Sequence, residues 1–312
     1  EDLGDTPEDA AARAEDAAQK ILQALREPYT LDGEAHHSSL SMGITVFSGM
    51  RETVDELLKR ADLAMYQAKS AGRDTLRFYD PQMQAAVSAR AALEADMRAG
   101  LAQEQFELYY QPQVDNGRIT GAEALLRWRH PRDGFVSPAQ FIPLAEESGL
   151  ILPLGEWVLN AACERLAQWA QQPLLAGLSL AVNVSPRQFH QSSFVPQVLA
   201  ALARSGAEGA RLKLEMTEGL LLADVEDTIA KMAKLKSYGV GFSLDDFGTG
   251  YSSLSYLKRL PLDQLKIDQA FVRDLLTQPQ DLAIAKTIIE LGSTLNMVVI
   301  AEGVETRGQH QK

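Results

Sequence analysis

The chain has 312 residues, 46% of them hydrophobic and 23% charged, which is typical of a globular protein and excludes disordered, collagenous and coiled-coil classes. Its 42 acidic and 30 basic residues give a net charge of −12, which disfavours a duplex nucleic-acid binder because phosphate binding normally uses a basic face. The single cysteine, Cys163, excludes an internal disulfide framework, and no apolar run is long enough to span a membrane. We therefore expect a cytoplasmic protein, with tethering through upstream segments left open.

The first eighty residues predict a small unit of helices and strands. We expect a helix over 10–25, a strand pair formed by 29–31 and 40–47, a helix over 53–70 ending near Gly72, and a strand over 75–79. Pro81 ends this pattern, and the Ala-rich stretch 82–105 predicts a helix suited to a rigid connector. Since the chain opens in mid-pattern, we expect it to begin inside a larger protein with upstream sensory or regulatory domains.

From residue 106 onward, short apolar strands alternate with amphipathic helices. The strands are FELYYQP, ITGAEALLRW, LSLAVNVS, RLKLEMTE, VGFSLDDF, QLKIDQA and MVVIAEGV, and the helices include 142–170, 194–205, 225–238, 252–260 and 282–295. This repetition predicts either an open doubly wound sheet or a (β/α)₈ TIM-like barrel. A barrel needs eight strands and this pattern supplies seven, so we expect the last strand to lie beyond Lys312.

Successive strands each carry a polar or ionisable residue within an apolar segment. They are Glu123, Asn183, Glu215, Asp245 with Asp246, Lys266 with Asp268, and Glu302. One such carboxylate alone is more often a helix cap or loop residue, but six strands in register indicate a shared site at the barrel mouth. Oxygen ligands without His or Cys favour Mg²⁺ or Mn²⁺ over zinc. The adjacent pair Asp245–Asp246 suits a two-metal site for phosphoester cleavage.

Other residues near these strands are interpreted by their position. Lys266 shares a strand face with Asp268, and Arg127 shares one with Glu123 and is suited to clamp a phosphate oxygen. The segment 248–250 lacks the lysine of a nucleotide P-loop, and we expect a mobile loop over the metals, followed by a helix capped by 252–253. The histidines and tryptophans fall outside this register and are interpreted as structural or surface residues.

Six motifs resemble, in order, the successive motifs of EAL domains, a family that hydrolyses cyclic di-GMP to linear pGpG. They are GAEALLRWRHP, NVSP, KLEMTEG, SLDDFGTGYSSL, LKID and AEGVE. The preceding SLSMGITVF and DELLKRADLAMYQAKSAGRDTLRFYD resemble the C-terminal half of a GGDEF domain, whose signature loop would lie before Glu1. The resemblance implies a partial α+β GGDEF-like domain over 1–80, a connecting helix over 81–105 and an EAL phosphodiesterase barrel over 106–312, with the first barrel strand antiparallel to the others.

The resemblance also implies roles for matching positions. The implied metal ligands are Glu123, Asn183, Glu215, Asp245, Asp246, Asp268 and Glu302, of which Glu123 and Glu302 are also catalytic candidates. Lys266 matches the lysine that holds the attacking water, and whether Glu302 is a ligand or a general base stays open. The implied substrate contacts are Gln111 and Arg127, and the carboxylates that anchor the loop after Asp246 are Glu218 and Glu305. Two Mg²⁺ or Mn²⁺ ions and a homodimer are expected, and Ca²⁺ is expected to inhibit.

One part of the family pattern is missing, because nothing after Glu305 supplies the glutamine motif of the family's last strand. The leading hypothesis is an active cyclic di-GMP phosphodiesterase, because the acidic positions are filled. The alternatives are a non-catalytic cyclic di-GMP receptor that signals through the connector and a dimerising scaffold.

Overall fold

The computed structural model describes residues 7–26, 28–31, 34–36, 38–47, 52–221, 224–248 and 257–312. The chain divides into two compact units, Glu1–Ala95 and Asp96–Lys312. Helix α3 (Pro81–Ala102) contains the boundary between them, and it begins with a proline, as helices often do because the first helical N–H needs no partner. In the described part of the chain, no helix combines the length and apolarity needed to cross a membrane.

The first unit contains α1 (Pro7–Arg26), β1 (Tyr29–Leu31), β2 (Glu34–His36), β3 (Met42–Ile44), α2 (Val54–Ser70) and β4 (Leu76–Phe78). Helix α2 begins with a capping box in which Thr53 and Glu56 each bind the other's backbone N–H. The predicted pairing of 29–31 with 40–47 is wrong. Strand β1 pairs antiparallel with β2, the next strand along the chain, and β3 pairs in parallel with β4.

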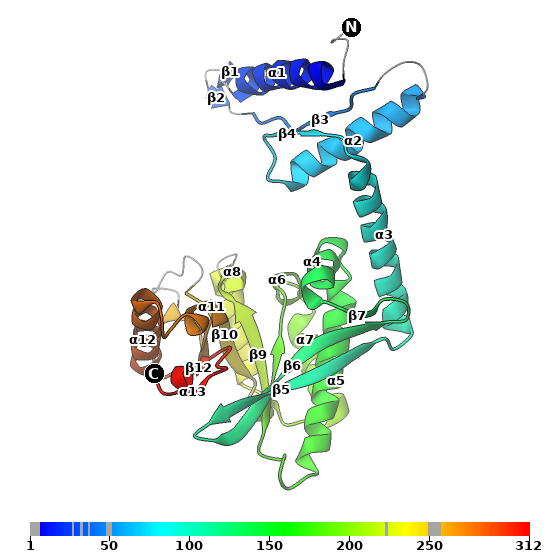
Figure 1. The fold of residues 1–312 in the computed structure, drawn as a ribbon. Coiled ribbons are helices and arrows are strands. Elements are labelled where there is room, and N and C mark those ends of the chain that lie inside the picture. Colours follow the sequence, from blue (N-terminus) through cyan, green and yellow to red (C-terminus); the bar gives the residue numbers. More distant parts are fainter. Residues whose placement is uncertain are drawn as a thin grey trace. The chain divides into compact units, whose positions relative to one another are not determined.

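The second unit is built on one curled sheet (Figure 1). Its strands are β5 (Phe106–Asp115), β6 (Arg118–His130), β7 (Gly134–Val136), β8 (Ser179–Asn183), β9 (Leu212–Thr217), β10 (Gly241–Phe247), β11 (Gln264–Ile267) and β12 (Val298–Ala301). They lie in the order β12-β11-β10-β9-β8-β6-β5, with β7 added to β6. Strands β5 and β7 each run antiparallel to β6, whereas β6, β8, β9, β10, β11 and β12 run parallel to one another. This is a TIM-like half-barrel with the antiparallel first strand that the resemblance implies.

Helices follow the strands of the second unit along the chain. They are α4 (Pro138–Ser148), α5 (Ile151–Ala170), α6 (Pro186–Phe189), α7 (Phe194–Ser205), α8 (Glu218–Leu221), α9 (Val225–Lys236), α11 (Gln269–Arg273), α12 (Pro279–Thr294) and α13 (Arg307–His310). The single helix predicted over 142–170 is wrong, because Gly149 has a φ of +83° and ends α4 in the left-handed conformation. The predicted helix 252–260 and its capping serines fall largely in 249–256, outside the described residues.

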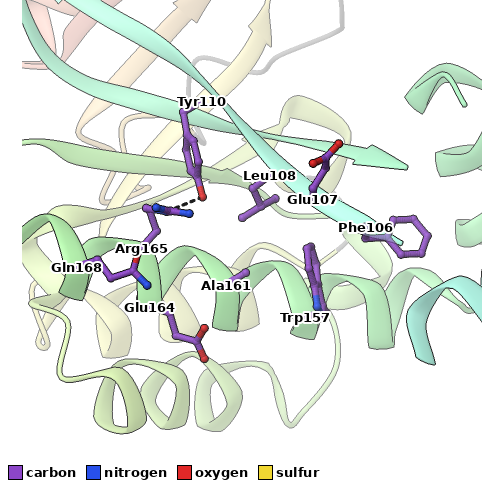
Figure 2. Close-up of a pocket in the computed structure, with 9 residues that line it drawn as sticks. All are labelled: Phe106, Glu107, Leu108, Tyr110, Trp157, Ala161, Glu164, Arg165 and Gln168. Carbon is purple, nitrogen blue, oxygen red and sulfur yellow. Dashed lines mark hydrogen bonds between the residues drawn. The ribbon is translucent and has the colours of Figure 1, made fainter. Parts of the chain in front are cut away.

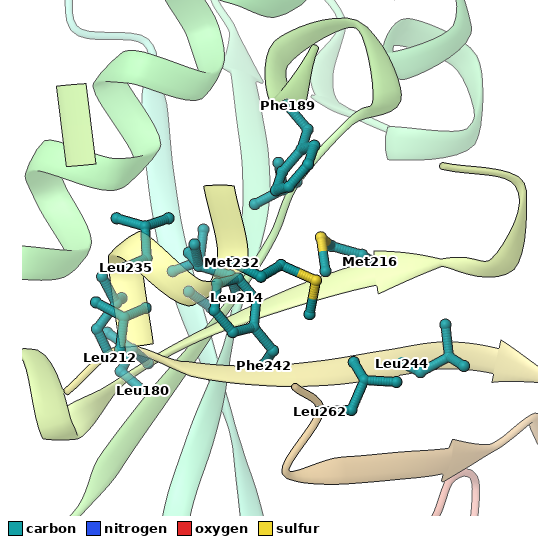
Figure 3. Close-up of a cluster of buried hydrophobic side chains, with 14 of the residues drawn as sticks. Leu180, Phe189, Leu212, Leu214, Met216, Met232, Leu235, Phe242, Leu244 and Leu262 are labelled. Atoms are coloured by element: carbon teal, nitrogen blue, oxygen red, sulfur yellow. The ribbon is translucent and has the colours of Figure 1, made fainter. Parts of the chain in front are cut away.

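Strand alternation separates the core from the site. On β9, Leu212, Leu214 and Met216 are buried toward the helices, whereas Lys213 and Glu215 share the opposite, inner face of the curled sheet. The same apolar layer continues through β8 and β10 and meets α6 and α9, as Figure 3 shows with Phe189, Met232 and Phe242. This core fixes the register of the strands, so it also fixes which polar residues lie level with one another.

The lack of a side chain at Gly121 allows β6 to lie close to β8. A Cβ on this residue would lie 2.5 Å from Ser179 Oγ and 2.7 Å from the Ser179 carbonyl oxygen. We expect Gly121→Ala to destabilise the protein by about 1–3 kcal/mol, because the two strands must separate. Chemical denaturation measures this loss. Gly177→Ala is the matched control, since nothing lies within 4 Å of its Cβ, and equal stability of the two variants would contradict the argument.

Candidate active site

Parallel neighbouring strands bring the predicted polar residues to one face of the sheet. Glu123 lies on β6 beside Ala181, and Asn183 of β8 pairs with Glu215 of β9. On β10, Ser243 pairs with Glu215, and Asp245 lies two residues farther along the same face of the strand. Lys266 lies on the next strand, β11. Glu302 directly follows β12, where its backbone N–H donates to the Ile267 carbonyl at 3.1 Å. Residues far apart in sequence therefore meet on the inner face of the half-barrel.

Lys266 lies at the centre of this cluster with a side chain that is 2% exposed. Its Nζ contacts four carboxylates, which are Glu123 Oε2 at 3.1 Å, Glu215 Oε2 at 2.8 Å, Asp245 Oδ1 at 3.1 Å and Glu302 Oε1 at 2.5 Å. A buried lysine is tolerated only when it is paired. The four contacts also show that these carboxylates converge on a volume that suits positive charge.

The pKa values within the cluster report an excess of negative charge. Burial alone would lower the pKa of Lys266, but Glu215, Glu123 and Asp245 outweigh it and raise that pKa above its ordinary value. Burial raises the pKa of Glu215 to about 8, with Lys266 opposing this rise and Glu123 adding to it. Burial also raises the pKa of Glu302, against the hydrogen bond from Lys266. A further cation at this position would stabilise the ionised carboxylates.

The side chains of Asp245 and Asp246 do not follow the usual alternation between the two faces of a strand. Adjacent strand residues point to opposite faces, but the pairing of β10 with β11 is irregular between Leu244 and Phe247, and Asp246 has a φ of +52°. As a result, one oxygen each of Asp245, Asp246 and Glu302 lies within 4.8 Å of the other two. Burial, a side-chain hydrogen bond with Asp268 and nearby carboxylates raise the pKa of Asp246 to about 6.

These donors fit a divalent cation. Oxygen ligands at this spacing are those that Mg²⁺ and Mn²⁺ prefer, and Glu215 Oε1 is buried without a hydrogen-bond partner among the described residues. An unpaired buried carboxylate oxygen is costly, and a cation would satisfy it. Asn183 Nδ2 donates to Glu123 Oε1 at 2.7 Å and so orients that carboxylate.

The other predicted site residues lie around this cluster. Gln111 pairs with Glu123 across β5 and β6, and Arg127 lies on the same face of β6 with its guanidinium 5.5 Å from the Tyr109 ring centre. Glu218 is buried, and its Oε1 accepts from the Gly248 N–H at 3.0 Å. Glu305 is exposed after β12.

The loop that was expected to cover the metals lies mostly outside the described residues, in 249–256. The hydrogen bond between Glu218 and Gly248 holds the residue at which that loop begins.

The hairpin strand β7 is a feature that the sequence did not predict. It places Phe135 opposite Arg129, near the C-terminal end of β6. The alternation of FELYYQP, in which Tyr109 shares a face with Gln111, is a sequence signal that also places an aromatic ring on this face.

The half-barrel and its inner carboxylate cluster define a TIM-like enzyme class with an acidic, cation-suited site. Comparison with protein families narrows this class: residues 94–312 match the EAL domain, and residues 3–75 match the diguanylate cyclase GGDEF domain. The chain belongs to the EAL domain family and carries part of a GGDEF domain before it.

Curated relatives contain the same domains. The bifunctional diguanylate cyclase/cyclic di-GMP phosphodiesterase MucR of Pseudomonas aeruginosa is 43% identical over 307 residues, which are 98% of this chain and 44% of MucR. The cyclic di-GMP phosphodiesterase NbdA of the same organism is 40% identical over 297 residues, which are 94% of this chain and 37% of NbdA. The chain thus spans less than half the length of either relative.

Solved structures agree with the fold. The PaMucR phosphodiesterase in complex with c-di-GMP is 46% identical, with a TM-score of 0.68 over 70% of this chain and 90% of that chain. The EAL enzyme Bd1971, in its cAMP- and cyclic-di-GMP-bound form, is 33% identical, with a TM-score of 0.70 over 83% of this chain and 69% of that chain.

Proposed function

We propose that this chain hydrolyses cyclic di-GMP to linear pGpG in a reaction that requires divalent metal ions. The observation that carries this proposal is the convergence of four carboxylates on Lys266 at the inner face of the half-barrel. The 46% identity to a phosphodiesterase domain solved with c-di-GMP supports the choice of substrate. In this proposal, residues 1–80 form a partial GGDEF-like domain, 81–105 connect it, and 106–312 form the phosphodiesterase barrel.

The proposed metal ligands are the oxygen donors of the cluster and its rim. They are Glu123, Asn183, Glu215, Asp245, Asp246, Asp268 and Glu302. When bound, Mg²⁺ or Mn²⁺ supplies Lewis-acid stabilisation of the phosphoryl oxygens and makes water more acidic. Asp245 and Asp246 lie side by side through the break in strand register, which supports a role for both in binding two neighbouring ions.

Side chains of the protein then orient the attacking water and accept its proton. Lys266 donates to the attacking water, and Glu302, 2.5 Å from Lys266 Nζ, accepts the proton that this water loses. The water oxygen forms a bond to phosphorus, the bond from phosphorus to the 3′-oxygen breaks, and that oxygen takes up a proton from solvent, while Glu302 releases its proton to solvent after the reaction. Arg127 binds a phosphate oxygen, and Gln111 contacts a guanine base.

Product analysis tests this proposal. Purified protein is incubated with cyclic di-GMP and Mg²⁺, and the nucleotides are separated by ion-exchange chromatography. We expect linear pGpG to accumulate, and EDTA to prevent its formation. Unchanged cyclic di-GMP after prolonged incubation with either Mg²⁺ or Mn²⁺ would overturn the proposed activity.

Replacement of Mg²⁺ by Ca²⁺ is expected to preserve nucleotide binding and to abolish turnover. Calcium takes six to eight ligands at about 2.3–2.6 Å in a looser geometry than in-line phosphoryl displacement requires. Equilibrium dialysis measures binding and chromatography measures cleavage in the same samples. Rapid cleavage with Ca²⁺ as the sole divalent ion would contradict this expectation.

A further inference from the structure

The inner face of β5, β6 and β7 carries a row of aromatic and arginine side chains beside the carboxylate cluster. We call Tyr109, Arg127, Phe135 and Arg129 the aromatic wall. Strand register places Tyr109 opposite Leu125, and Phe135 opposite Arg129. Of these four residues, the reaction proposed above uses Arg127 alone.

The two faces of β5 differ in what covers them. Figure 2 shows Leu108 and Tyr110 directed toward α5, where the Tyr110 hydroxyl accepts a hydrogen bond from Arg165 Nε at 3.1 Å. Because successive strand residues alternate, Tyr109 lies on the opposite face, which it shares with Gln111. Tyr109 is 45% exposed and Phe135 is 54% exposed. Large aromatic side chains at such exposure, beside a cluster of charged groups, indicate a binding surface rather than core.

Contacts within the wall hold the rings in place. The Tyr109 and Phe135 rings pack edge to face with centres 6.0 Å apart. The Arg127 guanidinium lies 5.5 Å from the Tyr109 ring centre, and that of Arg129 lies 5.3 Å from the Phe135 ring centre. Arg127 also donates to the Leu126 carbonyl at 2.9 Å, which restricts its guanidinium. The wall is therefore a preordered surface that presents π faces together with positive charge.

The wall begins within reach of a substrate held at the carboxylates. Leu125, the partner of Tyr109, is two residues beyond Glu123 on β6, which corresponds to roughly 7 Å along the strand. Arg129, the partner of Phe135, is six residues beyond Glu123, which corresponds to roughly 20 Å. A phosphodiester bound at the cluster would thus place its attached nucleoside against Tyr109, with Phe135 farther along the same surface.

The aromatic and arginine side chains of the aromatic wall are of the types that bind nucleotides. Nucleobases stack on aromatic rings and on arginine guanidinium planes, and phosphates pair with arginine. We propose that Tyr109, supported by Phe135, forms the surface on which one guanine base of the substrate stacks, while Arg127 neutralises the adjoining phosphate. This inference rests on the proposed function and adds two residues that set affinity for the purine.

The test uses this chain with a cyclic dinucleotide in which fluorescent 2-aminopurine replaces one guanine, and with cyclic di-GMP itself. Stacking on an aromatic ring quenches 2-aminopurine fluorescence. We expect Tyr109→Ser to lose this quenching and to raise the KM for cyclic di-GMP about tenfold, the effect of one lost base–aromatic stack, with kcat little changed. Tyr109→Phe should retain both properties, and Phe135→Leu should show a smaller loss.

Tyr238→Ser is the matched control, because Tyr238 is 53% exposed and has the Lys234 ammonium 5.3 Å from its ring centre, but follows α9 away from the wall. It should behave as wild type. Unchanged KM and quenching in Tyr109→Ser, measured while the wild type cleaves cyclic di-GMP, would overturn the stacking inference alone. Absence of cleavage by the wild type would instead overturn the proposed function, and the binding signal would still decide whether Tyr109 contacts the base.

Discussion

Replacing Glu123 by alanine is expected to reduce the kcat for cyclic di-GMP hydrolysis by more than about 10³-fold. Glu123 is the carboxylate that both Lys266 and Asn183 contact, at 3.1 and 2.7 Å. Its loss removes a proposed metal ligand and the acceptor that orients Asn183. Because bound metals supply several kcal/mol of transition-state stabilisation and about 1.4 kcal/mol corresponds to a factor of ten, a loss of this size follows.

The fold should survive this change, because Glu123 lies on the inner face of β6 while the apolar core lies on the outer face. Circular dichroism and the denaturation midpoint check that the variant is folded. Asp115→Ala is a suitable control, since Asp115 is another carboxylate in the β5–β6 pair, opposite Arg118 at the end of the pair away from Arg127. A turnover number for Glu123→Ala equal to that of the wild type would remove Glu123 from the site.

Replacing Lys266 by methionine is expected to abolish hydrolysis and to destabilise the metal-free protein by about 3–5 kcal/mol, the cost of removing one partner from a buried ion pair. The substitution leaves four carboxylates near one another, and the Glu215 side chain is 0% exposed. Mg²⁺ should recover part of the lost stability, because an ion that binds only the folded state stabilises that state. Denaturant titration with Mg²⁺ and with EDTA measures both effects.

Lys213→Met is the matched control for this substitution. Lys213 lies on β9 close to the same cluster, and its Nζ contacts the Gln264 Oε1 at 3.3 Å. Burial lowers the pKa of Lys213, so the protein disfavours its charged form and methionine should cost much less there. Equal losses for the two variants would show that methionine packing, and not the four carboxylates, determines the stability of Lys266→Met.

Much of this site was predictable from sequence because strand alternation is regular. Glu123, Glu215 and Lys266 each lie in an apolar strand whose buried neighbours point outward, so their own side chains had to point inward. Parallel pairing then brought residues separated by 143 positions, Glu123 and Lys266, into contact. The resemblance to EAL domains added the antiparallel direction of β5, which periodicity does not reveal.

Features that depend on single backbone angles were not predictable. The helix expected over 142–170 is interrupted at Gly149. The apolar pattern continues on both sides of this residue, so the sequence gives no sign of its left-handed conformation. The pairing of β1 also differed from expectation. Its partner is β2, the next strand along the chain, and not the more apolar segment 40–47. The left-handed φ of Asp246, which brings Asp245 and Asp246 together, leaves no pattern in sequence.

A single-turnover experiment decides whether the carboxylate cluster hydrolyses the bound nucleotide. Protein in excess is first saturated with cyclic di-GMP in EDTA, Mg²⁺ is then added in excess of the chelator, and samples are quenched over time for ion-exchange chromatography. We expect the bound cyclic nucleotide to convert to linear pGpG in the wild type and to stay intact in Glu123→Ala. If the wild type binds the nucleotide tightly and leaves it intact after Mg²⁺ or Mn²⁺ is added, the site is a receptor for cyclic di-GMP and the proposed hydrolysis is contradicted.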